Sequence, residues 1–195
     1  MSEPLASGYC DFIAGGVAIS TLRASEMLFS DAYIDETLAF VVPDASRDRF
    51  STWERIGQMR GLTIAVPNVK YYIDLLQRRL PHAELRVVKS LTDPFANWDP
   101  DVDAFALPAE RGSAWTLLYP KFTVIVPEPG IIKIPLAFPL ARHDEAFATF
   151  MNTWIDLKRK DGTMQQLYDY WVLGQDAVRP TPRWSIMRNV LGWLD

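Results

Sequence analysis

Arg23 stands at a position in the sequence where an anion could be held. It follows Ser20 and Thr21, which are good helix N-cap residues, and a helix is predicted over residues 22–28. Free backbone N–H groups at the start of a helix favour a carboxylate or a phosphate. A guanidinium adds a planar set of donors that matches a carboxylate with two hydrogen bonds. The other interpretation is that Arg23 is exposed on its helix and makes an ordinary surface ion pair.

A short apolar run, residues 9–14, precedes this segment and ends at Gly15 and Gly16. Such a run is typical of a buried parallel strand that stops where the backbone comes close to a ligand or to another segment. Cys10 lies within the run and is the single cysteine of the chain, so it cannot form an internal disulfide. We expect Cys10 to be buried and inert.

Residue patterns for catalysis or metal binding are weak. His82 and His143 are the two histidines, and neither belongs to a Ser–His–Asp or Cys–His spacing. Asp99, Asp101 and Asp103 alternate as in a cation-binding loop, but the glycine and the terminal glutamate of an EF-hand are missing. The prediction is therefore that the chain has no metal, no cofactor and no catalytic residues.

Composition narrows the class of protein further. The chain has 195 residues, 49% of them hydrophobic, and a formal net charge of −4, which is typical of a globular domain. The chain has no basic cluster interleaved with aromatic residues, so nucleic-acid binding is not expected. Its longest apolar stretches, such as residues 38–43 and 122–126, are too short to cross a bilayer as helices.

Strand-like and helix-like segments alternate along the middle of the chain. Short strands are predicted at residues 63–66, 85–88, 104–107 and 123–126, with helices at 71–80 and 111–118. This alternation is the pattern of an α/β fold. Two further helices are predicted near the C-terminus, each with apolar residues at helical spacing that we expect to face the core. These residues are Phe147, Phe150, Met151 and Trp154, and then Met164, Leu167, Tyr168 and Trp171.

Five motifs in order resemble those of the family 3 extracellular solute-binding proteins, the amino-acid-binding group of the type 2 periplasmic binding proteins. The resemblance covers roughly residues 9–174. The motifs are Asp-Phe-Ile-Ala-Gly-Gly at 11–16 with Ile-Ser-x-x-Arg at 19–23, Phe-Ser-Asp-Ala-Tyr at 29–33, Ile-Gly-x-x-Arg-Gly-Leu-Thr-Ile-Ala-Val at 56–66, Asp-Val-Asp-Ala-Phe-Ala at 101–106, and the Asn, Leu-Lys, Gly-Thr, Leu-Tyr and Trp positions of 152–171.

The resemblance implies a periplasmic-binding-protein type II-like α/β fold with two lobes and a two-strand hinge, lobe one being incomplete at its N-terminus. Residues 1–43 would form part of lobe one and the first hinge strand, and 44–129 would form lobe two. Residues 130–174 would form the second hinge strand and the return to lobe one, and 175–195 an extra linker and a C-terminal helix. The apolar runs at 38–42 and 131–135 would be the paired hinge strands.

The resemblance also implies a ligand site between the lobes, in which Arg23 grips a carboxylate. Pro108 stands where the family carries an acidic residue for an amine, so an α-amino acid is disfavoured unless Glu110 replaces that residue. Lys70 is either a second cation of the site or an ordinary solvated residue at a helix start. The predicted ligand-binding residues are Arg23, Ala18, Gly16, Lys70, Tyr71, Asn68 and Glu110.

The function implied is an extracytoplasmic solute-binding domain, without enzymatic activity, that captures a small anionic solute, either a carboxylate or an amino-acid-like compound, for transport or sensing. Its partner would be a membrane transporter or sensor protein, in the same polypeptide or separate from it, and its location periplasmic or extracellular. A first alternative is a sensor or interaction module of a membrane protein whose ligand site has degenerated. A second, weaker alternative is an enzyme like the cyclohexadienyl dehydratases.

Overall fold

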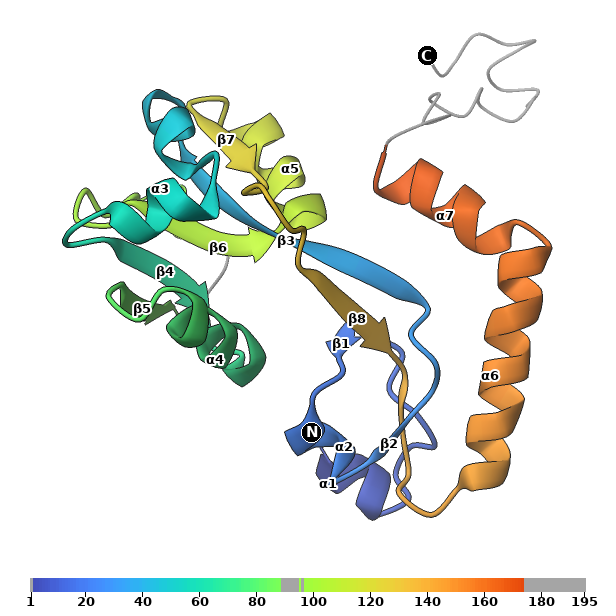
Figure 1. Cartoon of the computed structure of the whole chain (residues 1–195). Helices are drawn as coiled ribbons and strands as arrows, with labels where there is room; N and C mark the ends of the chain where they lie inside the picture. The colour runs from blue at the N-terminus through green and yellow to red at the C-terminus, as the bar shows by residue number, and fades with distance from the viewer. Residues whose placement is uncertain (1, 89–94, 96, 174–195) are drawn as a thin grey trace, which may run out of the picture. The chain divides into compact units, whose positions relative to one another are not determined.

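The structure is a computed structural model that describes residues 2–88, 95 and 97–173 (Figure 1). The chain divides into two compact units, Met1–Thr153 and Trp154–Asp195. The elements of the first unit are α1 (Ser2–Ala6), β1 (Val17–Ala18), α2 (Thr21–Ala24), β2 (Leu28–Phe29), β3 (Ile34–Pro43), a 3-10 helix (Asp44–Phe50), α3 (Trp53–Gln58), β4 (Thr63–Pro67), α4 (Lys70–Arg79), β5 (Glu84–Val88), β6 (Ala104–Pro108), α5 (Ala109–Leu118), β7 (Phe122–Ile125), β8 (Lys133–Ala137) and β9 (Pro139–Leu140). Helix α6 (Glu145–Lys160) begins in the first unit and ends in the second, where α7 (Thr163–Trp171) follows.

Strand β3 joins the two lobes of the first unit. Its first half pairs antiparallel with β8, from Ile34 opposite Leu136 to Thr37 opposite Lys133. Its second half pairs with β6 and β7 in the other part of the sheet, and Figure 1 shows the strand passing from one part to the other. The predicted partner of the run 38–42 is therefore wrong: β8 pairs with residues 34–37 of β3, whereas residues 38–43 pair with β6 and β7. Only the N–H of Leu38, which donates to the carbonyl of Ile132, links that run to the segment 131–135. The fold is a type II periplasmic-binding-protein-like α/β fold with a two-strand hinge.

The lobe-two sheet has the α/β organisation that the sequence predicts. Strand β4 lies between β5 and β6 and pairs in parallel with both, and every residue of β4 and β6 is buried. Strands covered on both faces read as continuous apolar runs, which is why residues 63–66 and 104–107 are recognisable from sequence alone. The predicted helices at 71–80 and 111–118 correspond to α4 and α5.

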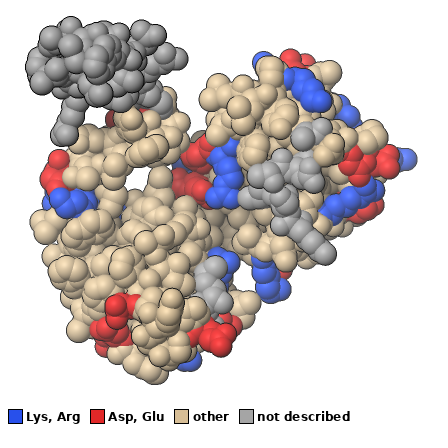
Figure 2. Space-filling model, turned by 180° about the vertical axis from the view of Figure 1, so that it is seen from behind, with Lys and Arg blue, Asp and Glu red and all other residues tan. Residues whose placement is uncertain are grey.

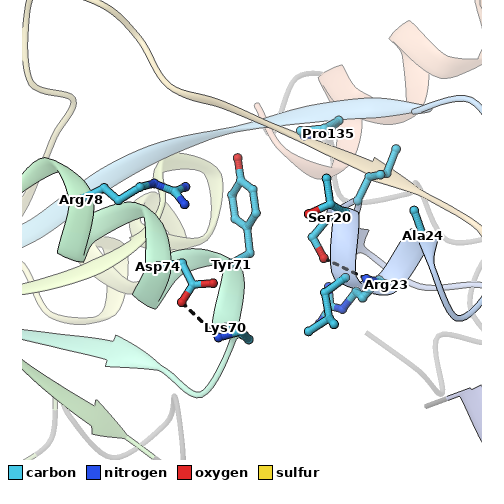
Figure 3. Close-up of a pocket in the computed structure, with 11 residues that line it drawn as sticks. Ser20, Arg23, Ala24, Lys70, Tyr71, Asp74, Arg78 and Pro135 are labelled. Atoms are coloured by element: carbon cyan, nitrogen blue, oxygen red, sulfur yellow. Dashed lines mark hydrogen bonds and ion pairs between the residues drawn. The ribbon is translucent and has the colours of Figure 1, made fainter.

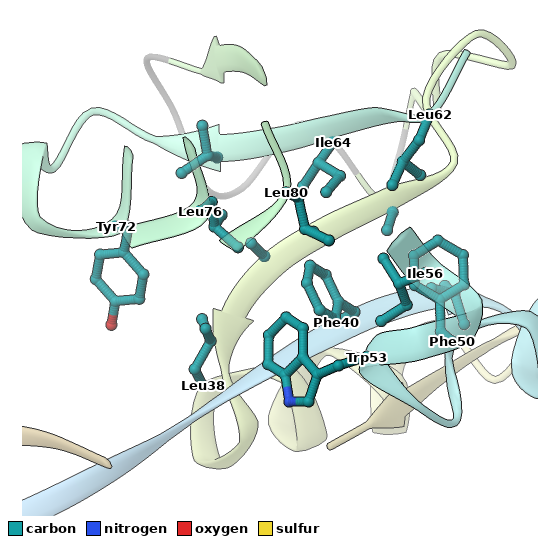
Figure 4. Packing of buried hydrophobic residues seen from close by; sticks show 14 of the residues in the cluster. Leu38, Phe40, Phe50, Trp53, Ile56, Leu62, Ile64, Tyr72, Leu76 and Leu80 are labelled. Carbon is teal, nitrogen blue, oxygen red and sulfur yellow. The ribbon is translucent and has the colours of Figure 1, made fainter. Parts of the chain in front are cut away.

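The core of this lobe forms around Phe40 of β3 (Figure 4). The Phe40 ring lies 5.6 Å from that of Phe50 and 5.8 Å from that of Trp53, measured between ring centroids. Ile56 of α3 and Leu76 of α4 are fully buried in the same cluster. Burial of an aliphatic or aromatic side chain of this size contributes about 1.5–3 kcal/mol. This core holds β3 against the helices that carry one wall of the site.

The predicted parallel strand at residues 9–14 is wrong. Phe12 makes a single antiparallel bridge to Leu140, and the N–H of Ile13 donates to the carbonyl of Pro139. One paired position covers few side chains, so Tyr9 is 87% exposed. Cys10, predicted to be buried, is half-buried and is a free cysteine.

The helix predicted over residues 22–28 is also shorter than expected. It spans only Thr21–Ala24, because Leu28 and Phe29 enter β2 and pair with Leu140 and Pro139 of β9. The predicted N-cap is confirmed, since the Ser20 hydroxyl accepts a hydrogen bond from the N–H of Arg23.

Helices are present near the C-terminus as predicted, but their apolar residues do not all face a core. Met151 is buried, whereas Phe150, Trp154, Leu167 and Trp171 are exposed. Helical spacing identifies residues that share a face, but it does not show that another element covers that face. The linker and helix predicted at 175–195 lie outside the described residues.

The surface shown in Figure 2 mixes both signs of charge, with Lys and Arg side chains next to Asp and Glu side chains. On that face the basic side chains form no continuous area of the kind that binds nucleic acid. Within the part of the chain that the structure describes, no helix has both the length and the apolar character needed to span a membrane.

Candidate functional site

Arg23 lies between two pockets of the first unit, and the larger of them has a volume of about 590 Å³ (Figure 3). One wall of this outer pocket is the segment of residues 19–24 that contains α2, and the opposite wall is α4. Volumes of this size are typical of sites for small ligands. The lining residues are Ile19, Ser20, Thr21, Leu22, Arg23, Ala24, Lys70, Tyr71, Asp74, Arg78 and Pro135.

Arg23 is held both through its backbone and through its side chain. Its backbone N–H donates to the Ser20 hydroxyl over 3.3 Å, which caps the short helix α2. Its Nη1 donates to the carbonyl oxygen of Ala18 over 2.8 Å. Ala18 is itself fixed in β1, where it pairs with Leu136 of β8. The bond to Ala18 uses one of the five N–H donors of the guanidinium. A guanidinium donor that is not engaged in this way can bind a carboxylate.

The α4 wall of the outer pocket adds charge of both signs. Lys70 and Asp74, four residues apart on the helix, form an ion pair of 3.3 Å between Nζ and Oδ1. Figure 3 shows Arg78, Asp74 and Tyr71 on the side of the pocket opposite Ser20 and Arg23. The charged side chains that line the pocket are three basic residues and one acidic residue, so the field in it favours an anion.

A second pocket of about 200 Å³, called here the inner pocket, is also lined by Arg23. It is bounded by β1 and β8, by the hinge strand β3, and by lobe-two residues at the ends of β4 and β6 and on α4 and α5. Its lining residues are Gly16, Val17, Ala18, Arg23, Glu36, Pro67, Val69, Tyr72, Pro108, Arg111 and Leu136. A solute in contact with Arg23 can therefore extend into both pockets.

Glu36, Tyr72 and Arg111 form the polar group of the inner pocket. The Tyr72 hydroxyl lies 3.5 Å from Glu36 Oε2, and Arg111 Nη2 lies 3.8 Å from Glu36 Oε1. Burial raises the pKa of Glu36, the Arg111 guanidinium opposes this rise, and the nearby Glu110 carboxylate adds to it. Burial, together with the charge of Glu36, also raises the pKa of Tyr72, which stays a neutral phenol at physiological pH.

The predicted site residues divide between the two pockets. Lys70 and Tyr71 line the outer pocket, and Gly16 and Ala18 line the inner one, with Arg23 shared by both. The predicted second cation, Lys70, is paired with Asp74 and so adds little net charge of its own.

Two predicted contacts line neither of these pockets. Asn68 is exposed in the turn before α4. The Glu110 carboxylate accepts a hydrogen bond from the backbone N–H of Thr37 over 3.1 Å. This bond ties α5 to the hinge strand β3, so Glu110 does not occupy the place left by Pro108, which itself lines the inner pocket.

Sequence reasoning missed Glu36, Tyr72 and Arg111. Glu36 precedes the apolar run 38–42 and is surrounded by polar neighbours, so it reads as a residue of a loop. A signal was present in the alternation of a strand: Glu36 lies two residues before Leu38, and residues two apart share a face. If the predicted strand had begun two residues earlier, at Glu36, this carboxylate would have been placed on the face that carries Leu38 and Phe40.

The described residues contain no cluster of three or more His, Cys, Asp and Glu side chains that could hold a metal ion. His82 and His143 are both exposed. Asp103 accepts a hydrogen bond from the N–H of Thr63 over 3.0 Å, which ties the start of β6 to β4.

Comparison with known proteins identifies the relatives of this fold. The family model described as bacterial extracellular solute-binding proteins, family 3, matches residues 1–174. No curated protein sequence matches the chain significantly.

Solved structures share the fold at low sequence identity. An ancestral amino acid-binding protein, described as a precursor of cyclohexadienyl dehydratase, has a TM-score of 0.73 and 21% identity, over 88% of this chain and 72% of its own. The solute receptor for L-cysteine of Neisseria gonorrhoeae has a TM-score of 0.73 and 21% identity, over 92% of this chain and 72% of its own. An amino acid ABC transporter substrate-binding protein of Streptococcus pneumoniae, bound to L-arginine, has a TM-score of 0.73 and 12% identity, over 85% of this chain and 69% of its own.

Proposed function

Because the chain belongs to the bacterial extracellular solute-binding proteins, family 3, we propose that it captures a small solute that carries a carboxylate, and that Arg23 holds this carboxylate. The observation that carries the proposal is the fixed guanidinium between two pockets. Its Nη1 is anchored on Ala18, and the two pockets of about 590 and 200 Å³ meet at it. A carboxylate paired with a guanidinium makes short, charge-assisted hydrogen bonds.

The solute would be enclosed by movement of two lobes about the hinge strands. We propose residues 1–43 and 130–174 for lobe one with its hinge strands, and residues 44–129 for lobe two. Gly16, Ala18 and Arg23 would then contact the solute from lobe one, and Lys70 and Tyr71 from lobe two. Glu110 would hold α5 against the hinge strand β3, since its carboxylate accepts a hydrogen bond from the backbone N–H of Thr37.

A net anionic solute fits the outer pocket best. Arg23, Lys70 and Arg78 line it against a single carboxylate, Asp74. Since Lys70 is already paired with Asp74, the positive charge that remains belongs to the two arginines. We propose that they favour a solute with at least one carboxylate and no excess of positive charge.

The place and partner of the protein follow from its family. The family consists of extracellular solute-binding proteins, and we propose a periplasmic or extracellular location for this chain. We propose that it delivers its solute to a membrane transporter or reports the solute to a membrane sensor, without transforming it. The partner would be a separate protein or another part of the same polypeptide.

A thermal-shift screen tests the proposal. The panel contains amino acids, dicarboxylates, monocarboxylates and inorganic anions, and the variants are wild type, Arg23→Ala and, as a matched control, Arg60→Ala. Arg60 is exposed and lines neither pocket. A compound present at a hundred times its Kd stabilises the folded protein by about 2.7 kcal/mol, which gives a clear shift.

We expect a carboxylate to stabilise the wild type and the Arg60→Ala variant but not Arg23→Ala. If no compound of the panel stabilises the wild type, the proposal is overturned in favour of a sensor or interaction module with a degenerate site. If a carboxylate stabilises Arg23→Ala as strongly as the wild type, Arg23 is not the carboxylate-binding group.

The position and the pKa of Glu36 favour one alternative function, that of a dehydratase that acts on a cyclohexadienyl compound. Its raised pKa lets Glu36 stay protonated to a higher pH than an ordinary glutamate, as a general acid requires, and it lines the pocket that Arg23 also lines. A protonated carboxyl there would give its proton to a leaving hydroxyl group, which departs as water, while the ring carboxylate leaves as carbon dioxide and its bonding electron pair completes the aromatic ring. Incubation with a hydroxycyclohexadienyl acid distinguishes the two functions, since the dehydratase forms an aromatic product that is seen by its ultraviolet absorbance, and a binding protein does not.

A further inference from the structure

The Glu36 carboxylate is largely enclosed but has no short hydrogen bond among the contacts described for it. Its side chain is 15% exposed. The Tyr72 hydroxyl is 3.5 Å from Oε2 and Arg111 Nη2 is 3.8 Å from Oε1. Good O–H···O hydrogen bonds measure about 2.5–3.0 Å, and guanidinium bonds to a carboxylate about 2.7–2.9 Å. Neither contact reaches these lengths, so both oxygens of Glu36 keep lone pairs for another donor.

An ionised carboxylate at this position lowers the stability of the folded protein unless a ligand donates hydrogen bonds to it. Removal of an ionised group from water costs free energy that loose contacts do not return. The raised pKa of Glu36 reflects this cost, because burial outweighs the Arg111 charge. Arg111 is a weak structural partner, since its side chain is 45% exposed and solvent competes for it.

The position of Glu36 also relates it to the proposed carboxylate-binding group. Glu36 and Arg23 line the same inner pocket of about 200 Å³, from the hinge strand β3 and from α2 respectively. A negative and a positive group in one small pocket match a solute that carries both charges. The larger outer pocket, with its excess of basic groups, leaves room for an additional neutral or acidic part of the solute.

We propose that Glu36 is the residue that selects the charge of the solute, by accepting hydrogen bonds from an ammonium group next to the carboxylate held by Arg23. The inference rests on the proposed function, because it assumes that Arg23 binds the carboxylate. It assigns the ammonium-binding role to Glu36 of the hinge strand β3. Neither Glu110 nor position 108, where a proline stands, has this role. Solutes with an ammonium group are therefore preferred over the same acids without one.

Matched pairs of compounds test this assignment. Each pair differs only in the ammonium group: alanine and propionate, glutamate and glutarate, phenylalanine and 3-phenylpropionate. Kd is measured by titration calorimetry for wild type, Glu36→Gln and the control Glu54→Gln. The control makes the same chemical change at an exposed carboxylate of α3 that lines neither pocket. The melting temperature of each unliganded variant is measured to confirm that it folds, and Glu36→Asp replaces Glu36→Gln if the latter does not fold.

In the wild type, the amino acid of at least one pair binds at least about tenfold more tightly than its deaminated acid, as expected for a hydrogen bond between charged groups. In Glu36→Gln this ratio falls close to one because the amino acid binds more weakly, while Kd for the acid stays similar. Glu54→Gln keeps the wild-type ratio. Glu36→Asp, which keeps the charge on a shorter side chain, gives an intermediate ratio.

Three outcomes overturn the assignment. If the acids bind the wild type as tightly as the amino acids, Glu36 does not select the charge, although the proposed function stands. If the preference for amino acids persists in Glu36→Gln, another group binds the ammonium. If no compound of any pair binds, this inference falls together with the proposed function, and Glu36 and Arg111 form only a structural ion pair.

Discussion

Arg23 Nη1 donates a hydrogen bond to the carbonyl oxygen of Ala18, five residues earlier in the chain, over 2.8 Å. The bond links the one-turn helix α2 to strand β1, which β8 holds in the sheet by antiparallel pairing. The guanidinium is therefore oriented before any solute arrives. A group oriented in advance loses little conformational entropy on binding, which benefits affinity.

This arrangement predicts that Arg23→Lys does not preserve binding. A lysine ammonium lacks the planar geometry that allows one edge to bind Ala18 while the other binds a carboxylate. We expect the affinity for the best carboxylate of the screen to fall by at least about tenfold, which corresponds to about 1.4 kcal/mol. Titration calorimetry measures this loss, with Arg60→Lys as the control. Equal affinity of Arg23→Lys and wild type would show that the planar guanidinium is not required.

Gly112 allows α5 to lie close against the lobe-two sheet. A Cβ at this position would lie 2.9 Å from Val41 Cγ2 and 3.1 Å from Val124 Cγ2. Gly112→Ala is therefore expected to destabilise the protein by about 1–3 kcal/mol, as overpacking does. Urea unfolding monitored by tryptophan fluorescence measures the change.

Gly57 in α3 provides the comparison, because a Cβ there meets no atom within 4 Å. Gly57→Ala is expected to increase the free energy of unfolding by about 0.5–1 kcal/mol, since alanine loses less backbone entropy on folding. The packing argument does not hold if the two substitutions change stability in the same direction.

Ser30 joins two segments that are distant in the sequence, those before β3 and after β8. Its hydroxyl accepts from the N–H of Phe138 over 3.0 Å and donates to the carbonyl of Asp31 over 2.9 Å, and the side chain is buried. Ser30→Ala leaves the Phe138 N–H without this partner, so we expect a loss of about 1–3 kcal/mol. Ser25→Ala, which removes an exposed hydroxyl, is expected to change stability by at most about 0.5 kcal/mol. Equal losses in the two variants would contradict the role assigned to Ser30.

Glu36 gives stability a pH dependence of predictable sign. Burial raises its pKa, with Arg111 opposing and Glu110 adding to the rise. The native protein thus binds a proton at Glu36 at pH values where the unfolded chain has lost it, so the free energy of unfolding contributed by this group falls as the pH rises.

The substitution Glu36→Gln removes this titration. The stability of Glu36→Gln relative to wild type is therefore expected to increase between about pH 4 and pH 7, the range above the ordinary carboxyl pKa. Urea unfolding at several pH values measures the difference. A difference that is constant or decreases with pH would show that Glu36 does not titrate with a raised pKa.

The lobe-two elements were predictable from the sequence because they are buried strands and amphipathic helices. Residues 64–66 and 104–107 are apolar throughout, and the structure buries both faces of β4 and β6. The short apolar run at 9–14 gave a similar signal, yet it makes only one bridge, at Phe12. Local pattern cannot show whether a neighbouring strand is present to complete the pairing.

The candidate site was predictable where it depends on local sequence and not where it depends on register. Ser20 and Arg23 lie in one short segment, so the cap and the position of the cation could be inferred. Glu36 reaches the inner pocket only because β3 pairs with β8 over residues 34–37 and brings this polar stretch into the sheet. The alternation with Leu38 indicates the strand face on which Glu36 lies, but the local sequence does not identify β8 as the partner strand.

A structure of the protein with the carboxylate that stabilises it most in the thermal-shift screen tests the central claim most directly. We predict that a carboxylate oxygen of the solute lies about 2.7–2.9 Å from a guanidinium nitrogen of Arg23, while Nη1 keeps its bond to Ala18. The account is contradicted if the solute lies outside both pockets, or if its carboxylate binds other groups and leaves Arg23 without contact.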